Sequence, residues 1–170
     1  VQLVDVTVRG REVRFGFDKL DRYMEMAEAS GIQYFEISHL FTQWGATAAP
    51  KILADVDGEV KQIFGWDTDA ASAEYTGFLK AFLEALQAHL RANDRLSRCY
   101  FHVSDEPSMD ALESYGRAAA VVDEALGGEC PVIDALSDYA FYEKGLVKHP
   151  IPANNHAVSY THLRAHETLA

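Results

Sequence analysis

The chain has 170 residues, of which 48% are hydrophobic, 11% aromatic and 24% charged. This composition is typical of globular protein and excludes disordered, collagen-like and low-complexity classes. With 15 basic and 26 acidic residues the formal net charge is −11, so nucleic acids and anionic membrane surfaces are poor partners, whereas a neutral carbohydrate is compatible.

Three further features limit what the sequence can specify. No apolar run approaches the ~20 residues that span a bilayer. The chain begins at Val1 inside a strand-like pattern, so we expect a fragment whose export signal, if it had one, is lost; cytoplasmic and exported locations both stay open. The two cysteines, Cys99 and Cys130, each stand near the start of an expected buried strand and are expected to be free thiols.

The C-terminal stretch reads unlike the rest of the chain. Residues 157–170 resemble a sequencing adaptor translated as coding sequence in metagenomic assemblies. We therefore expect a non-native tail there and leave it out of functional reasoning. His162 and His166, which are spaced like a helical metal pair, are set aside for the same reason.

The first third of the chain predicts a hairpin, a helix and a strand. Residues 2–8 and 12–17 alternate in polarity around a turn, which indicates a hairpin. Asp18 is expected to cap a helix that ends at Gly31. The helix carries an apolar stripe made of Leu20, Tyr23, Met24 and Ala27. Residues 32–37 then form a short apolar run that suits a buried strand.

A long connecting segment, residues 38–69, follows that strand, and loops of such length are often functional. Within it, residues 51–56 and 59–64 flank Asp57-Gly58, a pair that favours the type I′ turn of a hairpin. A helix with one broad apolar stripe is then expected over residues 70–92.

The remaining elements alternate strand and helix. Strands are expected at residues 99–103 and 131–136, and helices at residues 108–126 and 137–144. This alternation indicates an α/β fold with parallel pairing and right-handed crossovers. No glycine-rich phosphate loop follows any strand, which disfavours a nucleotide-binding fold. Polar residues gather at the strand ends, as at the catalytic face of a barrel, so we predict a partial (β/α)8 TIM-type barrel with about half of its units present.

The strongest local motif is residues 102–107, which read His-Val-Ser-Asp-Glu-Pro. Neighbouring side chains on a regular strand point to opposite faces, but at a strand end this alternation lapses. Pro107 suits the first turn of the next helix and favours extended geometry at Glu106. Asp105 and Glu106 are thereby predicted to converge on one pocket, with one carboxyl ionised and the other held as a general acid. Taken alone, acidic residues in this position are more often present because the N-terminus of the following helix favours negative charge.

Four motifs in the same order resemble the domain-of-unknown-function 4091 proteins, which include the β-N-acetylgalactosaminidases of glycoside hydrolase family 123. They are residues 34–46, 64–70, 100–107 and 134–139. The resemblance covers about residues 1–156, and it implies a fragment of a glycoside hydrolase catalytic barrel over that range.

The resemblance implies a substrate-assisted, retaining hydrolysis of a terminal β-linked N-acetylhexosamine, with N-acetylgalactosamine favoured. Asp105 would orient the 2-acetamido group, whose carbonyl oxygen attacks the anomeric carbon to give an oxazoline-type intermediate. Glu106 would protonate the departing oxygen and then activate water. No protein nucleophile and no cofactor or metal is implied.

Further residues are candidates for sugar binding. Trp44 and Trp66 offer ring faces for stacking or for core packing, with neither favoured. The full set of expected substrate-binding residues is His39, Trp44, Trp66, Asp67, His102, Asp134, Tyr139 and Asn154. Four other aromatic residues, Phe17, Tyr75, Phe78 and Phe82, are expected in the core, as is Tyr115.

Two alternatives stay open at this point. The first is a metal-dependent barrel hydrolase whose ligands would be His39, His102, Asp105, Glu106 and Asp134. The second is a module that binds glycans without cleaving them. The sequence leaves the exact sugar, the linkage and the oligomeric state open.

Overall fold

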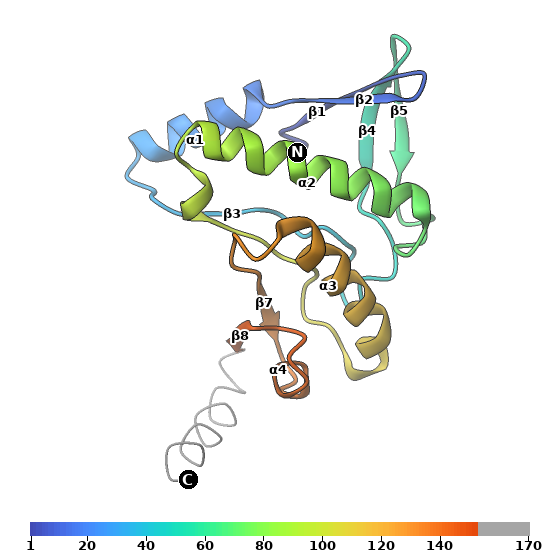
Figure 1. Ribbon diagram of the computed structural model, residues 1–170, viewed down its shortest axis with the longest axis vertical. Helices are drawn as coiled ribbons and strands as arrows, with labels where there is room; N and C mark the ends of the chain where they lie inside the picture. The colour runs from blue at the N-terminus through green and yellow to red at the C-terminus, as the bar shows by residue number, and fades with distance from the viewer. Residues whose placement is uncertain (153–170) are drawn as a thin grey trace.

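Two hairpins join into one four-stranded sheet in the computed structural model, which describes residues 1–152 (Figure 1). The first hairpin is β1 (Asp5–Arg9) with β2 (Glu12–Gly16), and the second is β4 (Ile52–Val56) with β5 (Glu59–Phe64). β1 and β4 pair in parallel, which gives the strand order β2-β1-β4-β5. Asp57 and Gly58 have φ of 52° and 97°, which confirms the predicted type I′ turn.

Residues 1–152 also contain four α-helices and two short 3₁₀ helices. They are α1 (Asp18–Ala29), α2 (Ala73–Ala92), α3 (Leu112–Leu126), α4 (Ala140–Glu143), η1 (Leu96–Arg98) and η2 (Met109–Ala111). α2 begins later than predicted because Ser72 caps it, accepting a hydrogen bond from the Tyr75 N–H at 3.3 Å. The expected cap of α1 is wrong, since Asp18 lies inside the helix and its side chain makes no cap. None of the helices in residues 1–152 combines the length and apolar character needed to cross a bilayer.

Four short strands of residues 1–152 form parallel pairs outside the four-stranded sheet. They are β3 (Phe35–Glu36), β6 (Cys99–Tyr100), β7 (Ile133–Leu136) and β8 (His149–Pro152). β3 pairs with β6 and β7 pairs with β8, and a parallel bridge between Phe101 and Val132 links the two pairs. The helices α2, α3 and α4 lie between these strands in sequence. The chain is therefore a mixed α/β fold with parallel strands in chain order, although β3 and β6 are shorter than expected.

The core lies between α2, α3 and these strands. Leu79, Leu83 and Leu90 on α2 are completely or almost completely buried, as predicted from their spacing. Cys99 and Cys130 are buried and free, and burial raises the pKa of the Cys99 thiol to about 11. Both cysteines therefore act as small apolar side chains.

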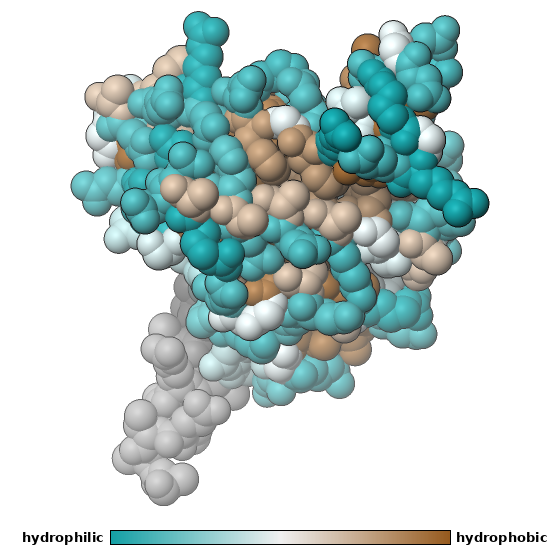
Figure 2. All heavy atoms as spheres, turned by 45° about the horizontal axis from the view of Figure 1, so that its top comes forward, coloured by the Kyte–Doolittle hydropathy of each residue, from teal (hydrophilic) through white to brown (hydrophobic). Residues whose placement is uncertain are grey.

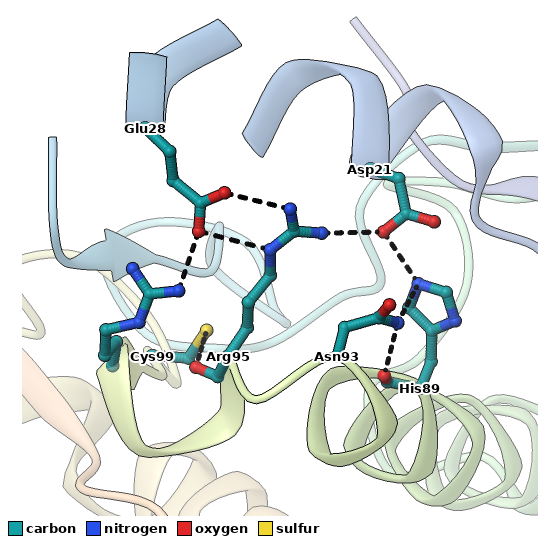
Figure 3. A network of polar contacts seen from close by, with 7 residues as sticks. Asp21, Glu28, His89, Asn93, Arg95 and Cys99 are labelled. Atoms are coloured by element: carbon teal, nitrogen blue, oxygen red, sulfur yellow. Dashed lines mark hydrogen bonds and ion pairs between the residues drawn. The ribbon is translucent and has the colours of Figure 1, made fainter. Parts of the chain in front are cut away.

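A polar network joins α1 to the C-terminal end of α2 and to η1 (Figure 3). Arg95, only 8% exposed, bonds Glu28 through two nitrogens at 2.9 and 3.2 Å and Asp21 at 3.1 Å. Arg98 reaches Glu28 at 2.7 Å, and His89 reaches Asp21 at 2.9 Å. These contacts fix α1 against the elements that precede β6.

A large apolar hollow opens between α1, α2 and the edge of β3 (Figure 2). Its volume is about 1010 Å³. Tyr23, Ile32 and Tyr34 lie on its walls and are about half exposed or more. Tyr23 was expected on the buried stripe of α1, but its side of the helix faces this open hollow.

Candidate active site

The segment after β3 lies alongside the segment after β6. Backbone N–H groups of Ile37, Leu40 and Phe41 donate to the carbonyls of Tyr100, His102 and Val103 at 2.8, 3.3 and 3.0 Å. Strand-like contact thus continues beyond the short regular strands. It brings residues 42–44 next to Asp105 and Glu106.

Asp105 is half-buried and is held by the neighbouring loop. Its Oδ2 accepts a hydrogen bond from Gln43 Nε2 at 3.2 Å, and its backbone carbonyl accepts one from the Trp44 N–H at 3.0 Å. Ser104, which is completely buried, donates from Oγ to the Thr42 carbonyl at 2.7 Å. Gln43 therefore holds the carboxylate of Asp105 at the strand end. Trp44, whose backbone bonds that of Asp105, is 70% exposed.

Glu106 is exposed and has a left-handed backbone, with φ of 42°. The extended geometry expected before Pro107 is wrong, because the contacts of residues 104 and 105 with the 42–44 loop turn the chain at this point. Among residues 1–152, no side chain forms a hydrogen bond or ion pair with the Glu106 carboxylate. Left-handed backbone is costly for a residue other than glycine, and such strain concentrates at functional sites.

Asp134 organises a buried cluster directly behind this turn. It is completely buried, and it accepts hydrogen bonds from the Val103 N–H at 3.1 and 3.3 Å. It also accepts one from the Tyr115 hydroxyl of α3 and lies 3.2 Å from His102 Nδ1. Direct substrate contact by Asp134 stays a prediction from the sequence. In the structure its carboxylate is enclosed by protein groups and holds the backbone at residues 102–103 in place.

The same cluster shifts the pKa of His102. Burial by itself lowers the pKa of an imidazole, but the hydrogen bond and the charge of Asp134, with a smaller contribution from Glu36, outweigh burial and raise the pKa of His102. His102 Nε2 lies 3.5 Å from the Glu36 carboxylate. Burial, together with the negative charge of Asp134, raises the pKa of Tyr115, so its hydroxyl stays protonated as a donor.

His39 packs its ring edge-on against His102, with 5.1 Å between the ring centroids, and it lines the apolar hollow together with Glu36. Within residues 1–152, no three His, Cys, Asp or Glu side chains are grouped as metal ligands would be. The five residues of the metal-dependent alternative therefore do not form a ligand set in the described part of the chain.

The other predicted binding residues lie elsewhere. Trp66 and Asp67 line a separate cleft against α3, and neither Asp105 nor Glu106 lines that cleft or the apolar hollow. Tyr139 precedes α4, and its ring centroid lies 5.4 Å from that of Tyr142. Asn154 and the predicted tail at residues 157–170 lie outside the described residues.

Three residues near Asp105 and Glu106 were not predicted from the sequence to be functional. Gln43 contacts Asp105, Glu36 faces His102, and Tyr115, expected only as core, donates to Asp134. Gln43 could have been identified from the sequence, since it directly precedes Trp44 within the motif at residues 34–46. The pairing of Tyr115 with Asp134 joins two distant elements and leaves no local pattern.

Comparison with known proteins identifies related molecules. Residues 1–169 match the family model described as glycoside hydrolase 123, catalytic domain. A similar solved structure is that of a family 123 glycoside hydrolase from Clostridium perfringens, studied for glycolipid glycan hydrolysis; its TM-score is 0.63 at 13% identity. The similarity covers 91% of this chain but only 27% of that one. No curated protein matches this chain.

Proposed function

Since the chain belongs to the glycoside hydrolase 123 catalytic-domain family, we propose that it supplies the catalytic carboxylates of a glycosidase. The proposed substrate is a glycan with a terminal β-linked N-acetylhexosamine, with N-acetylgalactosamine favoured. The position of Asp105 and Glu106 carries the proposal, because these consecutive acids lie where a parallel strand ends, one held by the adjacent loop and the other exposed.

The two acids have different surroundings, which suits different roles. Asp105 is oriented by Gln43, so its carboxylate is pre-positioned to hold the N–H of the 2-acetamido group and stabilise the positive charge that develops there. The acetamido oxygen attacks the anomeric carbon, the glycosidic bond breaks, and an oxazoline-type intermediate forms. The configuration is retained, because water then displaces the acetamido oxygen at the same carbon.

Glu106 is the proposed general acid and base. It gives its proton to the departing glycosidic oxygen and then takes a proton from the incoming water, which returns the carboxyl to its starting state. Its exposed side chain is accessible to a substrate. The proposed positioning residues behind the pair are Asp134 and Tyr115, which hold the backbone that leads into Asp105.

We also propose that β3, β6, β7 and β8 are consecutive strands of a (β/α)8 barrel. Their parallel pairing in chain order supports this arrangement, as do the intervening helices. In such a barrel Asp105 and Glu106 lie at the carboxyl ends of the strands, the face on which barrel enzymes place their catalytic groups.

The test is hydrolysis of aryl β-N-acetylgalactosaminide and aryl β-N-acetylglucosaminide by the full-length protein that carries this chain. Glu106→Gln is expected to lower kcat by about 10²–10⁴-fold, the usual contribution of a positioned general acid. Asp110→Asn, which removes an exposed acid four residues further along, is the matched control and should keep full activity. Equal activity of the Glu106→Gln protein, or hydrolysis of neither substrate by the folded protein, would overturn the proposal.

A module that only binds glycans is the second candidate, because Trp44 and Trp66 both expose their rings. It predicts that Glu106→Gln leaves glycan affinity unchanged and that the wild-type protein releases no sugar. Measuring product release and binding on the same two proteins separates the candidates.

A further inference from the structure

A second cleft lies next to the candidate active site, between the loop at residues 65–71 and helix α3. Its volume is about 790 Å³, within the range of small-molecule sites. Its walls carry an indole ring, carboxylates, hydroxyls and a guanidinium, contributed by Trp66, Asp67, Asp69, Thr76, Ser114 and Arg117. These groups have no role in the proposed mechanism.

The indole of Trp66 is 83% exposed, the highest exposure of any large apolar side chain within the described chain apart from that of the terminal Val1. Exposing so large an apolar ring is unfavourable unless something covers it. A flat aromatic ring suits the apolar face of a sugar ring, while polar groups beside it bind the hydroxyls.

The polar groups of the cleft match a neutral ligand. Asp67 and Asp69 can accept hydroxyl protons, and Arg117, held by Glu113 at 2.6 Å, can donate. The carboxylates of Asp67 and Asp69 carry two negative charges, while the positive charge of Arg117 is already paired with Glu113. The electrostatic potential in the cleft is therefore negative. This charge disfavours acidic sugars and selects neutral ones.

One loop forms a wall between the cleft and the catalytic pair. Ser114 Oγ donates to the Gly45 carbonyl at 2.6 Å, and the Ala70 N–H donates to the Thr47 carbonyl at 3.0 Å. The preceding residue of the same loop, Trp44, donates to the Asp105 backbone. A Cβ on Gly45 would come within 2.7 Å of Ala111 Cβ, so the loop packs closely against the start of α3.

We propose that this cleft binds neutral sugar units of the glycan beyond the residue cleaved at Asp105 and Glu106. The identity of the ligand as a glycan rests on the proposed function. Trp66 stacks on a sugar ring, and Asp67 and Arg117 bind its hydroxyls. An oligosaccharide is thereby held across the 42–48 loop.

The test uses the full-length protein with Glu106→Gln, so that the ligand is not consumed. The probe is a neutral trisaccharide that ends in β-linked N-acetylgalactosamine, and hydrogen–deuterium exchange locates its binding. Slower exchange at residues 65–71 is expected. Adding Trp66→Ala should remove that protection and weaken affinity about tenfold.

Val60→Ala is the matched control, because it removes another highly exposed apolar side chain, 76% exposed on β5, outside the cleft. Arg117→Met supplies a second variant, for which weaker binding is also expected. Unchanged exchange at residues 65–71, or an affinity unaffected by Trp66→Ala and Arg117→Met, would overturn the inference. Failure of the proposed function appears separately, as absent hydrolysis by the wild-type protein.

Discussion

Glu106 combines an exposed carboxylate with backbone geometry that side chains rarely adopt. Its φ of 42° costs roughly 1–2 kcal/mol in a residue with a Cβ, and glycine would avoid this cost. The residue is therefore poorly suited to stability at this position. The strain is consistent with the proposed role of its carboxyl group, since strained backbone concentrates at functional sites.

If this strain is present, replacing Glu106 by glycine should lower activity while relieving an unfavourable contribution to stability. Glu106→Gly should lower kcat at least as much as Glu106→Gln does, because both remove the carboxyl group. It should also be more stable than Glu106→Gln by up to about 1 kcal/mol, since glycine's greater freedom when unfolded offsets only part of the relieved strain. Urea unfolding measures the difference. At Glu84, in the middle of α2, the same pair of substitutions should show glycine as the less stable variant. A lower midpoint for Glu106→Gly than for Glu106→Gln would contradict the argument.

His102 is expected to titrate above the ordinary imidazole value of 6.5, because Asp134 favours its charged form. A raised pKa in the folded state means that this pair contributes stability fully below pH 6.5 and loses it as the pH rises through the folded pKa. Asp134→Asn should lower the pKa of His102, since burial then dominates. An NMR titration, with His102→Gln to assign the signal, checks the shift. A His102 pKa unchanged in Asp134→Asn would contradict the prediction.

At the scale of elements, the network around Arg95 holds α1 against α2 and η1 (Figure 3). The hydrogen bond from Arg95, followed by that from Arg98, lowers the pKa of Glu28 from 4.5 to about 2. This contribution to stability is present above pH 4.5 and is lost as the pH falls toward 2. Glu28→Gln should therefore be less stable near neutral pH and lose less stability between pH 4.5 and 2.

Chemical unfolding of Glu28→Gln across this pH range provides the measurement. Glu84→Gln removes an exposed acid from α2 and should retain the acid dependence of the wild-type protein. If the two variants respond alike to acid, the network does not link α1 to α2 energetically.

Elements whose signals are local were predicted correctly from the sequence. The prediction was wrong where contacts between residues distant in sequence determine the backbone conformation. The Asp57-Gly58 turn and the α2 stripe depend on neighbours in sequence, and both are confirmed. Glu106 shows the opposite case, because contacts from the 42–44 loop override the preference that Pro107 imposes. The bounds of β8 were not predicted, since Pro150 and Pro152 obscure the pattern of a strand, yet it pairs with β7.

The candidate site follows the same rule. The acidic pair and the surrounding motif were visible in sequence, whereas the enclosure of Asp134 depends on α3 packing against β7. Trp66 looked equivalent to Trp44 because both lie in one long segment. Folding separates them, placing one beside Asp105 and the other in the cleft against α3.

At the scale of the whole molecule, the chain leaves much apolar surface uncovered. The hollow of about 1010 Å³ exposes side chains of α1 and of the segment between α1 and β3, including Tyr23 at 51%, Ile32 at 49% and Tyr34 at 59%. Such surface is usually covered in a stable protein. The chain also corresponds to only 27% of the structural neighbour, so there is ample further polypeptide in that protein to cover an equivalent face.

We therefore predict that the 170-residue chain by itself is marginally stable and inactive. It should unfold at low urea with weak cooperativity and bind a dye that reports exposed apolar surface. Ile32→Lys is expected to act differently in the isolated chain and in a longer protein. It should make the isolated chain more soluble. In a longer protein that covers this face, it should lower the free energy of unfolding by about 1–3 kcal/mol. Cooperative unfolding of the isolated chain with a high midpoint, without dye binding, would contradict the prediction and show that the hollow needs no cover.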